Sequence, residues 1–398
     1  MKAARSVRID TLRGIAVFGI MLVNVWGFAL GNNFSRYGII GEHAPLLDQL
    51  VVFVVAAFAE QKFYPIFAFL FGAGFALQTG GRHFPGPRFE RIKTTYRRRV
   101  TWLLGCGVLH GSFLWFGDIL TVYAVCGFWL LTHAGRRLSG IVDSLRRLAA
   151  LNVGVLVFMA YLTYQLMTMP PEAVTWGVAE IARTHAVYSE GTLGAIARER
   201  LLDFWGNLVN SLFFLPKVAL LFLMGVVSVR LGWLTRPGRH RVLWGRVLAA
   251  ALWVGLPINL WWGWAALGDA IDPHAGGPLA AFMSFLVEVA GPLMAAGYVA
   301  LVMRAPEQVL AALAQWLAPV GRMALTNYLA QSVLFGLLLQ GTGLRLGALL
   351  SHAGLVGVCV LLMLAQALFS RWWMRRHAQG PVEQVWRRFA AGGDPTGG

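Results

Sequence analysis

The stretch RRRVTWLLGCGVLHGSFLW, from Arg97 to Trp115, sets three arginines directly before an apolar run. Outward from this stretch the arrangement repeats, because long apolar runs are separated by short segments that are alternately rich and poor in arginine. A helix needs roughly 20 apolar residues to cross about 30 Å of hydrocarbon, so each run is a candidate transmembrane helix. The alternation therefore predicts an all-α polytopic membrane protein.

The amino-acid composition supports the same class. Of the 398 residues, 57% are hydrophobic and 13% are charged, and the mean hydropathy is +0.61. Soluble domains carry about a quarter of their residues as charged side chains, so the low charged fraction indicates a surface that faces lipid. We expect residues 1–389 to form a single transmembrane domain and the glycine-rich residues 390–398 to be disordered. Ten spans are expected, around residues 9–30, 47–78, 100–116, 119–132, 145–167, 208–231, 242–267, 279–303, 324–340 and 350–373.

The distribution of the arginines predicts the direction of the spans. Arginine-rich segments precede the first span, follow the second, fourth, sixth and eighth spans, and end the chain. The positive-inside rule then places these segments and both termini in the cytoplasm. The net charge of +16 is interpreted as this orientation signal, which also favours contact with anionic membrane lipids, and no nucleic-acid partner is expected. The intervening segments carry only Arg36, Arg183, Arg198, Arg200 and Arg345.

The longest segment on the predicted outer side covers residues 170–206. It combines acidic residues with apolar residues at helical spacing, such as Val174, Val178 and Ile181. This pattern predicts two short helices at the membrane interface, covering an opening between spans. The alternative is a connector without such a role.

The second run carries the densest group of polar residues inside a predicted span, Glu60, Gln61 and Lys62. Pro65 follows them and removes the backbone hydrogen bond to the Gln61 carbonyl. The run is also longer than the hydrocarbon requires, since some thirty residues give about 45 Å of helix. We therefore expect a helix that is broken near Pro65, with Glu60 and Lys62 at a binding site near the membrane midplane. The alternative is a structural ion pair between Lys62 and a carboxylate such as Glu288.

His110 lies in the third run, and Asp118 follows it at a corner formed with Gly117. Counted from the arginine-rich side, His110 should lie beyond mid-membrane, toward the outer face. Histidine has an unperturbed pKa that suits proton transfer near neutral pH, and a carboxylate can fix its tautomer. On an unbroken helix the two side chains would be about 80° apart, so they converge only if the corner turns Asp118 back. We expect a catalytic pair; the alternative for His110 is a hydrogen bond between helices.

The ninth run places Asn327 and Gln331 on one helix face, with Arg322 before them near the inner interface. Amides inside a span commonly join helices. An arginine with polar neighbours at the cytoplasmic side can instead bind a phosphate or carboxylate. Both interpretations stay open, and the three residues are candidate binding residues.

The first run begins with Asp10 and Arg13, three residues apart, and carries Asn24 in its outer half. Asp10 and Arg13 suit an ion pair at the interface. Polar and ionisable groups in hydrocarbon are costly unless they are paired or face a wet cavity. Arg13 and Asn24 are therefore also candidate binding residues.

The cysteines give no indication of a metal or a disulfide. Cys106, Cys126 and Cys359 lie in apolar runs without the spacing of metal ligands, so we expect small packing residues. The sequence also contains no phosphate-binding loop or haem motif. It therefore predicts no metal site and no tightly bound cofactor.

Five stretches, in order along nearly the whole chain, form a recognisable pattern. It resembles the YeiB-like family of uncharacterised bacterial inner-membrane proteins. This resemblance implies a multi-pass protein of the bacterial cytoplasmic membrane. The stretches are residues 8–24 with RIDTLRGIA at the start, residues 62–75, residues 110–120, residues 321–329 with GRMALTNYL, and residues 379–386 with QGPVEQVW.

The opening of this family is similar to that of the broader transmembrane acyltransferase superfamily, which includes heparan-α-glucosaminide acetyltransferases and acyltransferases of bacterial surface sugars. These enzymes transfer an acyl group from a cytoplasmic CoA thioester to an acceptor on the far side. The resemblance implies that Arg13 and Arg322 contact the CoA phosphates. It also implies that His110, oriented by Asp118, is the general base or a transient acyl carrier. The chain departs from the surface-sugar enzymes at Asn24, where those enzymes carry a catalytic histidine.

The function expected from these observations is a membrane-embedded acyltransferase with acyl-CoA as co-substrate and an acceptor hydroxyl or amine at the outer side. A small-molecule transporter is the alternative, with Lys62, Glu60, Glu288 and His110 along a substrate or proton path. A structural or sensory protein, in which polar groups only lock helices, is a further alternative. The expected partners are membrane lipids, acyl-CoA, the acceptor and, as an open question, a second copy in a homodimer.

Overall fold

The computed structural model describes residues 6–32, 36–79, 87–167, 171–272 and 278–392, and their regular structure is helical throughout. The all-α expectation is therefore confirmed for this part of the chain. In chain order the helices are α1 (Val7–Leu30), α2 (Leu46–Phe58), α3 (Phe63–Gln78), α4 (Pro87–Phe113), α5 (Leu120–Leu131), α6 (Leu138–Met167), α7 (Pro171–Glu190), α8 (Leu193–Arg230), the 3-10 helix η1 (Pro237–His240), α9 (Arg241–Ala250), the π-helical turn η2 (Ala251–Gly255), α10 (Leu256–Ile271), α11 (Pro278–Arg304), α12 (Glu307–Arg322), α13 (Ala324–Leu339), α14 (Leu346–Leu349), α15 (His352–Arg376) and α16 (Pro381–Ala391).

Seven helical segments among the described residues are long and apolar enough to cross a membrane. They are α1, the α2–α3 pair, α6, α8, the segment from η1 to α10, α11 and α15. The bent pair α12–α13 would make eight. The chain is thus a polytopic membrane protein, as expected. The number ten stays a prediction, because α5 has only 12 residues and α4 begins inside an arginine-rich segment.

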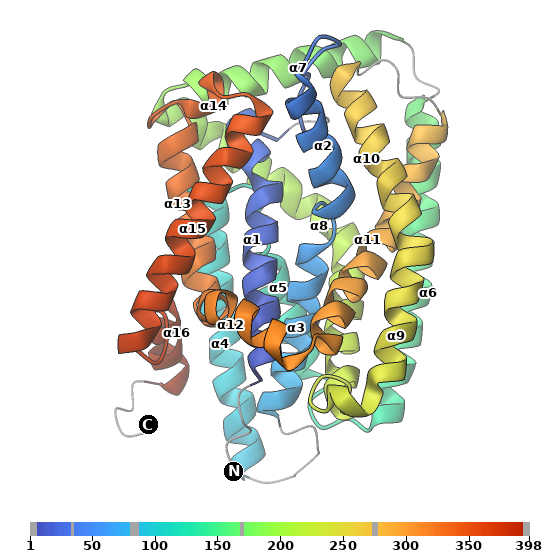
Figure 1. Ribbon diagram of the computed structural model, residues 1–398, viewed down its shortest axis with the longest axis vertical. Coiled ribbons are helices and arrows are strands. Elements are labelled where there is room, and N and C mark those ends of the chain that lie inside the picture. The colour runs from blue at the N-terminus through green and yellow to red at the C-terminus, as the bar shows by residue number, and fades with distance from the viewer. Residues whose placement is uncertain (1–5, 33–35, 80–86, 168–170, 273–277, 393–398) are drawn as a thin grey trace.

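The long helices lie side by side in one bundle (Figure 1). α1, α4 and α9 begin at one end, where α16 also lies; we name it the arginine-rich end, after the segments that meet there. α7 and α14 lie at the opposite end, named the α7 end. The first and last described helices therefore share an end, which agrees with termini on one side of the membrane. Which end faces the cytoplasm stays a prediction.

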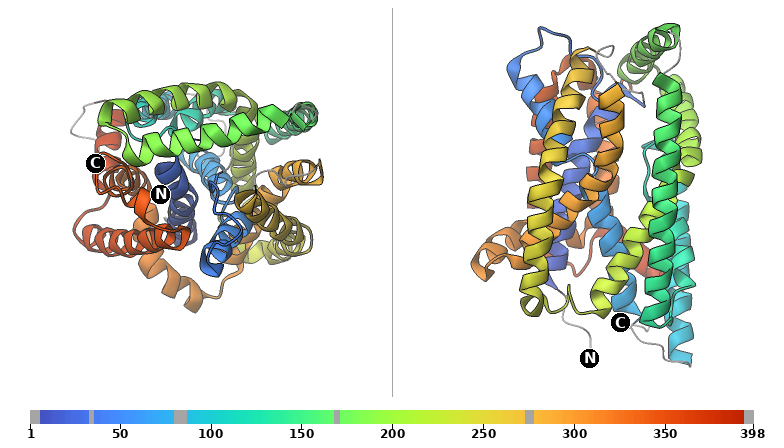
Figure 2. Two further views of the ribbon diagram at one scale, coloured as in Figure 1. Left: turned by 90° about the horizontal axis from the view of Figure 1, so that it is seen from above. Right: turned by 90° about the vertical axis from the view of Figure 1, so that its right-hand side faces the viewer.

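The predicted outer segment is helical, but only one of its two helices is separate. α7 lies across the α7 end, and the first part of α8 runs beside it (Figure 2). Arg183 Nη2 contacts Glu199 Oε1 at 2.5 Å, and Tyr188 donates to Asp203 at 2.8 Å. Arg183 also donates a hydrogen bond to Glu180, which lowers the pKa of that carboxyl. The second expected helix is instead the start of α8, whose 38 residues continue into the bundle. Position 170 lies outside the described residues.

The chain end also differs from expectation in one detail. α16 extends to Ala391, so the first residues of the predicted disordered tail are helical. Residues 393–398 lie outside the described part of the chain.

The break in the second run is present, as expected, between Phe58 and Phe63. Gln61 adopts a left-handed backbone conformation with φ of 62°, which an unbroken helix does not allow. Pro65 lies in the first turn of α3, where the missing N–H costs least. The two half-helices therefore meet at a turn inside the bundle.

Lys62 stabilises this break. The Glu60 N–H bonds to the Val55 carbonyl, so the Ala56 carbonyl lacks its usual helical partner. Lys62 is fully buried, and its Nζ donates to that carbonyl at 2.9 Å. A positive charge at the carboxyl end of a helix is also favoured by the helix dipole. The pair between Lys62 and Glu288 considered above is not formed, since Glu288 binds Lys217.

Two helix crossings depend on glycine. A Cβ at Gly72 of α3 would lie 1.9 Å from the Phe222 carbonyl oxygen of α8. A Cβ at Gly225 of α8 would lie 2.0 Å from the Phe69 carbonyl oxygen of α3. Each helix therefore presents a glycine where the backbone of the other passes, which is how membrane helices reach close van der Waals contact.

The crossing of α1 and α12 has the same reciprocal form. A Cβ at Gly14 would lie 2.1 Å from the Leu317 carbonyl oxygen, and a Cβ at Gly321 would lie 1.9 Å from the Asp10 carbonyl oxygen. Arg13 precedes the first glycine and Arg322 follows the second. The contact therefore brings two of the predicted site arginines to one place.

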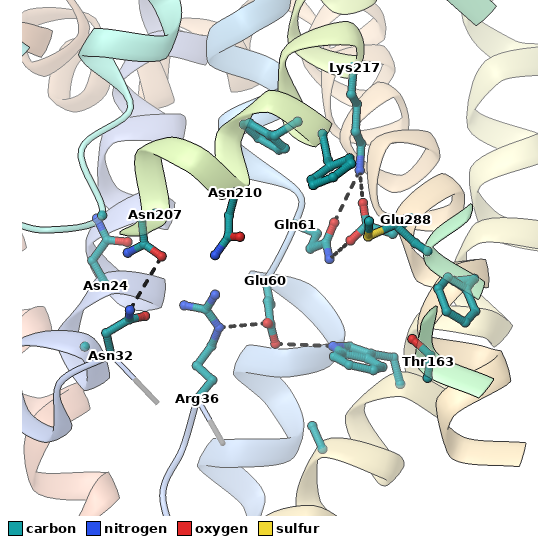
Figure 3. Close-up of a pocket in the computed structure, with 18 of the residues that line it drawn as sticks. Asn24, Asn32, Arg36, Glu60, Gln61, Thr163, Asn207, Asn210, Lys217 and Glu288 are labelled. Carbon is teal, nitrogen blue, oxygen red and sulfur yellow. Dashed lines mark hydrogen bonds and ion pairs between the residues drawn. The ribbon is translucent and has the colours of Figure 1, made fainter. Parts of the chain in front are cut away.

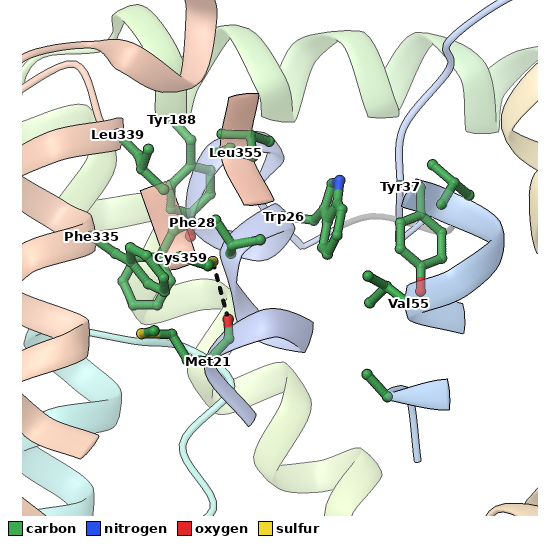
Figure 4. Packing of buried hydrophobic residues seen from close by; sticks show 14 of the residues in the cluster. Met21, Trp26, Phe28, Tyr37, Val55, Tyr188, Phe335, Leu339, Leu355 and Cys359 are labelled. Atoms are coloured by element: carbon green, nitrogen blue, oxygen red, sulfur yellow. Dashed lines mark hydrogen bonds between the residues drawn. The ribbon is translucent and has the colours of Figure 1, made fainter. Parts of the chain in front are cut away.

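The apolar core at the α7 end contains one of the three cysteines (Figure 4). Cys359 of α15 is fully buried, and its Sγ lies 3.9 Å from the Met21 carbonyl oxygen of α1. Phe28 and Phe335 belong to the same cluster. All three cysteines are free thiols, and Cys359 contacts its neighbours as a packing residue.

Replacement of Gly72 by alanine should lower the thermal stability of the protein. The added methyl group would collide with the α8 backbone, and overpacking of this kind costs about 1–3 kcal/mol. Gly357→Ala in α15 is the matched control, because no atom lies within 4 Å of its added Cβ. Thermal unfolding in detergent should separate the two variants; equal melting temperatures would contradict the close crossing.

Cysteine labelling tests the orientation. In a variant whose native cysteines are replaced by alanine, Glu190→Cys should react with a membrane-impermeant maleimide in intact cells, because Glu190 ends α7 and its side chain is 65% exposed. Asp143→Cys, whose side chain is 60% exposed at the other end, should react only after permeabilisation. The reverse pattern would overturn the predicted orientation.

Candidate functional site

Two overlapping cavities of about 700 Å³ and about 400 Å³ form one hollow, named here the polar cavity (Figure 3). Its shared walls come from α1, the break between α2 and α3, α8 and α11. The helix break therefore supplies part of the cavity wall, through Glu60 and Gln61. A concave site with several polar groups is typical of small-molecule binding. The polar residues common to both parts are Asn24, Arg36, Glu60, Gln61, Asn207, Asn210 and Glu288.

Glu60 is the most strongly fixed carboxylate of the polar cavity. Arg36 Nε donates to its Oε1 at 2.8 Å. Tyr37 and Trp262 donate to its Oε2 at 3.0 Å and 3.2 Å. Three donors, two from the neighbouring residues Arg36 and Tyr37 and one from α10, compensate the burial of this side chain, which is only 6% exposed. Glu60 is therefore held in one orientation inside the bundle.

A second ion pair stands at the edge of the polar cavity. Lys217 of α8 contacts Glu288 of α11 at 2.5 Å, and Gln61 donates to the other oxygen of Glu288 at 2.5 Å. Lys217 and Glu288 also border an apolar cavity of about 340 Å³ between α3, α8, α9 and α11. The pair therefore marks the boundary between a polar and an apolar hollow.

His110 and Asp118 meet, because the corner at Gly117 turns Asp118 back toward α4. The distance from His110 Nδ1 to Asp118 Oδ1 is 2.8 Å, and both side chains are almost completely buried. Gly107 permits this approach, since a Cβ there would lie 2.9 Å from Asp118 Oδ2. The corner therefore brings the two side chains together, which is the condition that the sequence analysis set for a His–Asp pair.

The hydrogen bonds around this pair define the histidine tautomer. Asp118 Oδ2 accepts from the Thr121 N–H and from Thr121 Oγ1, each at 2.8 Å. A carboxylate that accepts on both oxygens leaves the Nδ1 position of His110 as the proton donor. His110 Nε2 is then the acceptor, and it faces Ser332 Oγ of α13 at 2.8 Å. Asp118, His110 and Ser332 therefore form a continuous hydrogen-bonded chain from the corner before α5 to α13.

A separate hollow of about 290 Å³, named here the arginine cavity, lies toward the arginine-rich end and is lined in part by α16. Its wall contains Arg13, Arg99, Arg322 and Arg387. Asp10 compensates Arg13 at 3.1 Å, but Arg99 is close enough to Arg13 and Arg387 for their charges to repel.

Glu383 is the one carboxylate in the arginine cavity wall among the described residues, and it is hydrogen-bonded to the start of α13. Glu383 accepts hydrogen bonds from the backbone N–H groups of Leu325 and Thr326 and from the Thr326 hydroxyl, so it caps the start of α13. The cavity therefore retains an excess of positive charge. Guanidinium groups in this arrangement suit phosphate groups.

The arginine cavity and the polar cavity share part of their walls. Ile20, Ile119 and Tyr328 border both the arginine cavity and the smaller part of the polar cavity. The Tyr328 ring lies 5.0 Å from the His110 ring, measured between centroids. His110 itself lines neither hollow but packs against Tyr328, which borders both, and Asp118 borders the polar one.

The other predicted site residues have structural contacts. Gln331 donates to Gln366 of α15 at 2.9 Å, and Asn327 donates to Ser370 of α15 at 3.0 Å. These two amides and Lys62 line none of the cavities described above. Asn327 and Gln331 therefore join α13 to α15, which is the alternative that the sequence left open for them.

The structure also brings in residues that the sequence did not single out. Ser332 is a small polar residue in an apolar helix, and Arg99 belongs to a basic run. Lys217 and Arg387 likewise gain their positions from contacts between distant segments. A lysine inside the sixth apolar run was the one signal that could have been used, because intramembrane charges are costly.

Comparison with known proteins identifies relatives of similar length. The chain is 30% identical over 395 residues to "Uncharacterized protein YeiB" of Escherichia coli (strain K12). This alignment covers 96% of each of the two chains. The chain is 26% identical over 396 residues to "Uncharacterized protein YxaH" of Bacillus subtilis (strain 168), covering 95% of this chain and 92% of the relative. A family described as "Protein of unknown function (DUF418)" matches residues 228–393, and no solved structure matches. The chain therefore belongs to the YeiB-like family of bacterial membrane proteins.

Proposed function

We propose that the protein is a membrane-embedded acyltransferase, which moves an acyl group from a cytoplasmic acyl-CoA to a hydroxyl or amine acceptor at the outer side. The observation that carries this proposal is the position of His110. It is oriented by Asp118, which borders the polar cavity, and it packs against Tyr328, which borders both the polar cavity and the arginine cavity. A transfer between two substrates that approach from opposite ends requires such a junction.

The arginine cavity is the proposed donor site. Acyl-CoA carries several phosphate groups, and Arg13, Arg99, Arg322 and Arg387 offer guanidinium donors within one hollow. Its walls also include Ile20 and Tyr328, which it shares with the polar cavity and which suit the apolar part of a thioester. Acyl-CoA is a co-substrate in this proposal, and no tightly bound cofactor is required.

His110 supplies the base. Its Nε2 lone pair can accept a proton from an attacking hydroxyl or amine, while Asp118 stabilises the imidazolium that forms. Burial of the pair favours this role, because oriented charges act strongly where water is excluded. Tyr328 must move aside for a substrate to reach Nε2.

The polar cavity is the proposed acceptor site. Asn24, Asn207, Asn210 and the fixed carboxylate of Glu60 can hydrogen-bond an acceptor that carries several hydroxyl or amine groups. Asn24 stands where surface-sugar enzymes carry their catalytic histidine. In this chain the proposal gives Asn24 a binding role and gives proton transfer to His110.

A transporter is the second candidate, and one observation favours it. Glu60, Glu288 and Lys217 are ionisable groups that line the polar cavity inside the bundle. Charges at such depth commonly mark substrate or ion pathways. Donor turnover distinguishes the two functions, since a transporter does not cleave a thioester.

Native mass spectrometry of the detergent-purified protein, titrated with acetyl-CoA and longer acyl-CoA thioesters, tests the donor site. We expect binding, and a loss of about tenfold in affinity for Arg99→Gln, equal to about 1.4 kcal/mol for one charge-assisted contact. Arg146→Gln should bind normally, because its side chain is 76% exposed and far from the cavity wall. His110→Ala should bind the donor but release no CoA thiol. No binding across the series would contradict the acyltransferase and favour the transporter.

A further inference from the structure

We infer that Ser332 is the nucleophile of this site and carries the acyl group as an ester between donor and acceptor. The inference rests on the proposed acyltransferase function and adds a covalent intermediate to it. Its basis is the chain from Asp118 through His110 to Ser332, with 2.8 Å at each of the two contacts made by the imidazole. A carboxylate, an imidazole and a hydroxyl in this order are the arrangement that activates serine in hydrolases and acyltransferases.

The direction of the hydrogen bonds supports this role. Asp118 is restricted to accepting, because Thr121 donates to its Oδ2 twice and His110 Nδ1 faces its Oδ1. His110 Nε2 therefore accepts, and the Ser332 hydroxyl donates its proton to that nitrogen. The proton that must leave a nucleophilic serine thus already points at a base.

The burial of the three groups argues in the same direction. Their positions are enclosed, with Ser332 3% and His110 2% exposed. A helix-joining serine needs only one polar partner, and α13 already binds α15 through Asn327 and Gln331. An oriented carboxylate behind the imidazole adds little to helix packing, but it fixes the tautomer in which Nε2 can accept a proton.

Tyr328 controls access to the nucleophile. It precedes Ser332 by four residues on α13, so both lie on one helix face. Tyr328 borders the arginine cavity and the polar cavity, and its ring packs against His110. Rotation of this side chain connects Ser332 first with a donor thioester and then with an acceptor.

The donor step balances without any further reactant. Ser332 Oγ attacks the thioester carbonyl carbon, and its proton passes to His110 Nε2. The carbon–sulfur bond breaks, and the imidazolium returns the proton to the thiolate. The products are CoA thiol and an acyl ester on Ser332.

In the acceptor step Ser332 is the leaving group and the acceptor is the nucleophile. The acceptor hydroxyl or amine attacks the ester carbon and gives its proton to His110 Nε2. The ester carbon–oxygen bond breaks, and the Ser332 oxygen recovers that proton. The enzyme returns to its starting state, and neither an oxidant nor a reductant takes part.

The test is to incubate the purified protein with acetyl-CoA without acceptor, quench in acid, and analyse the peptides by mass spectrometry. We expect an acetyl group on the peptide containing Ser332, and its absence in Ser332→Ala and His110→Ala. Ser332→Cys should form a thioester that neutral hydroxylamine removes. Turnover of Ser332→Ala should fall by about a millionfold, as for loss of a nucleophile, while acetyl-CoA affinity stays within twofold of wild type.

Ser370→Ala is the matched control, because it also removes a buried hydroxyl that joins helices at α13 but lies outside the triad. It should keep the acetyl adduct and most of the turnover. A fluorophosphonate probe gives a readout without donor: it should label Ser332 in wild type and Ser370→Ala but not in His110→Ala. This labelling tests the role of Ser332 even if Ser332→Ala fails to fold, because it uses wild type, Ser370→Ala and His110→Ala.

The outcomes separate the two proposals. Acyl transfer that persists within tenfold in Ser332→Ala, with no adduct in wild type, would overturn the covalent intermediate and leave an acyltransferase with direct attack by the acceptor. Thioester cleavage that is absent in wild type, together with absent donor binding, would overturn both proposals.

Discussion

The close contact of α1 and α12 is the constraint on which the site depends. Gly14 and Gly321 each lie against the backbone of the other helix, where a Cβ would come within about 2 Å of a carbonyl oxygen. Small residues allow such contact in a membrane, where no hydrophobic effect drives helices together. The neighbouring Arg13 and Arg322 are thereby brought into one cavity. The same principle at α3 and α8 brings the helix break, with Glu60 and Gln61, beside α8.

The polar groups inside the bundle divide into two kinds. Asn327 and Gln331 join α13 to α15, and Lys62 satisfies a carbonyl that the helix break exposes. Glu60 and Glu288 instead face the polar cavity, although each is also bound by cationic or amide donors. Because an unpaired polar group in hydrocarbon is costly, every such residue needs a partner. Only the second kind borders a cavity.

The proposed reaction centre is assembled from both halves of the chain. His110 comes from α4 and Asp118 from the corner between α4 and α5, whereas Ser332 comes from α13. The DUF418 match covers residues 228–393 and so includes only the α13 contribution, while the relatives align over nearly the full length. A functional unit of this kind requires the whole bundle, since neither half contains the hydrogen-bonded chain.

The sequence by itself determined the class of the protein, the apolar helices, the broken second span and the candidates His110 and Asp118, because hydrophobic length, proline chemistry and the cost of buried charge are local properties. The tertiary structure decided which candidates share a cavity. It placed Asn327 and Gln331 against α15 and brought Ser332 within 2.8 Å of His110 across 222 positions of sequence. Contacts between distant helices depend on their crossing geometry, and no periodicity within one helix encodes which face meets which neighbour.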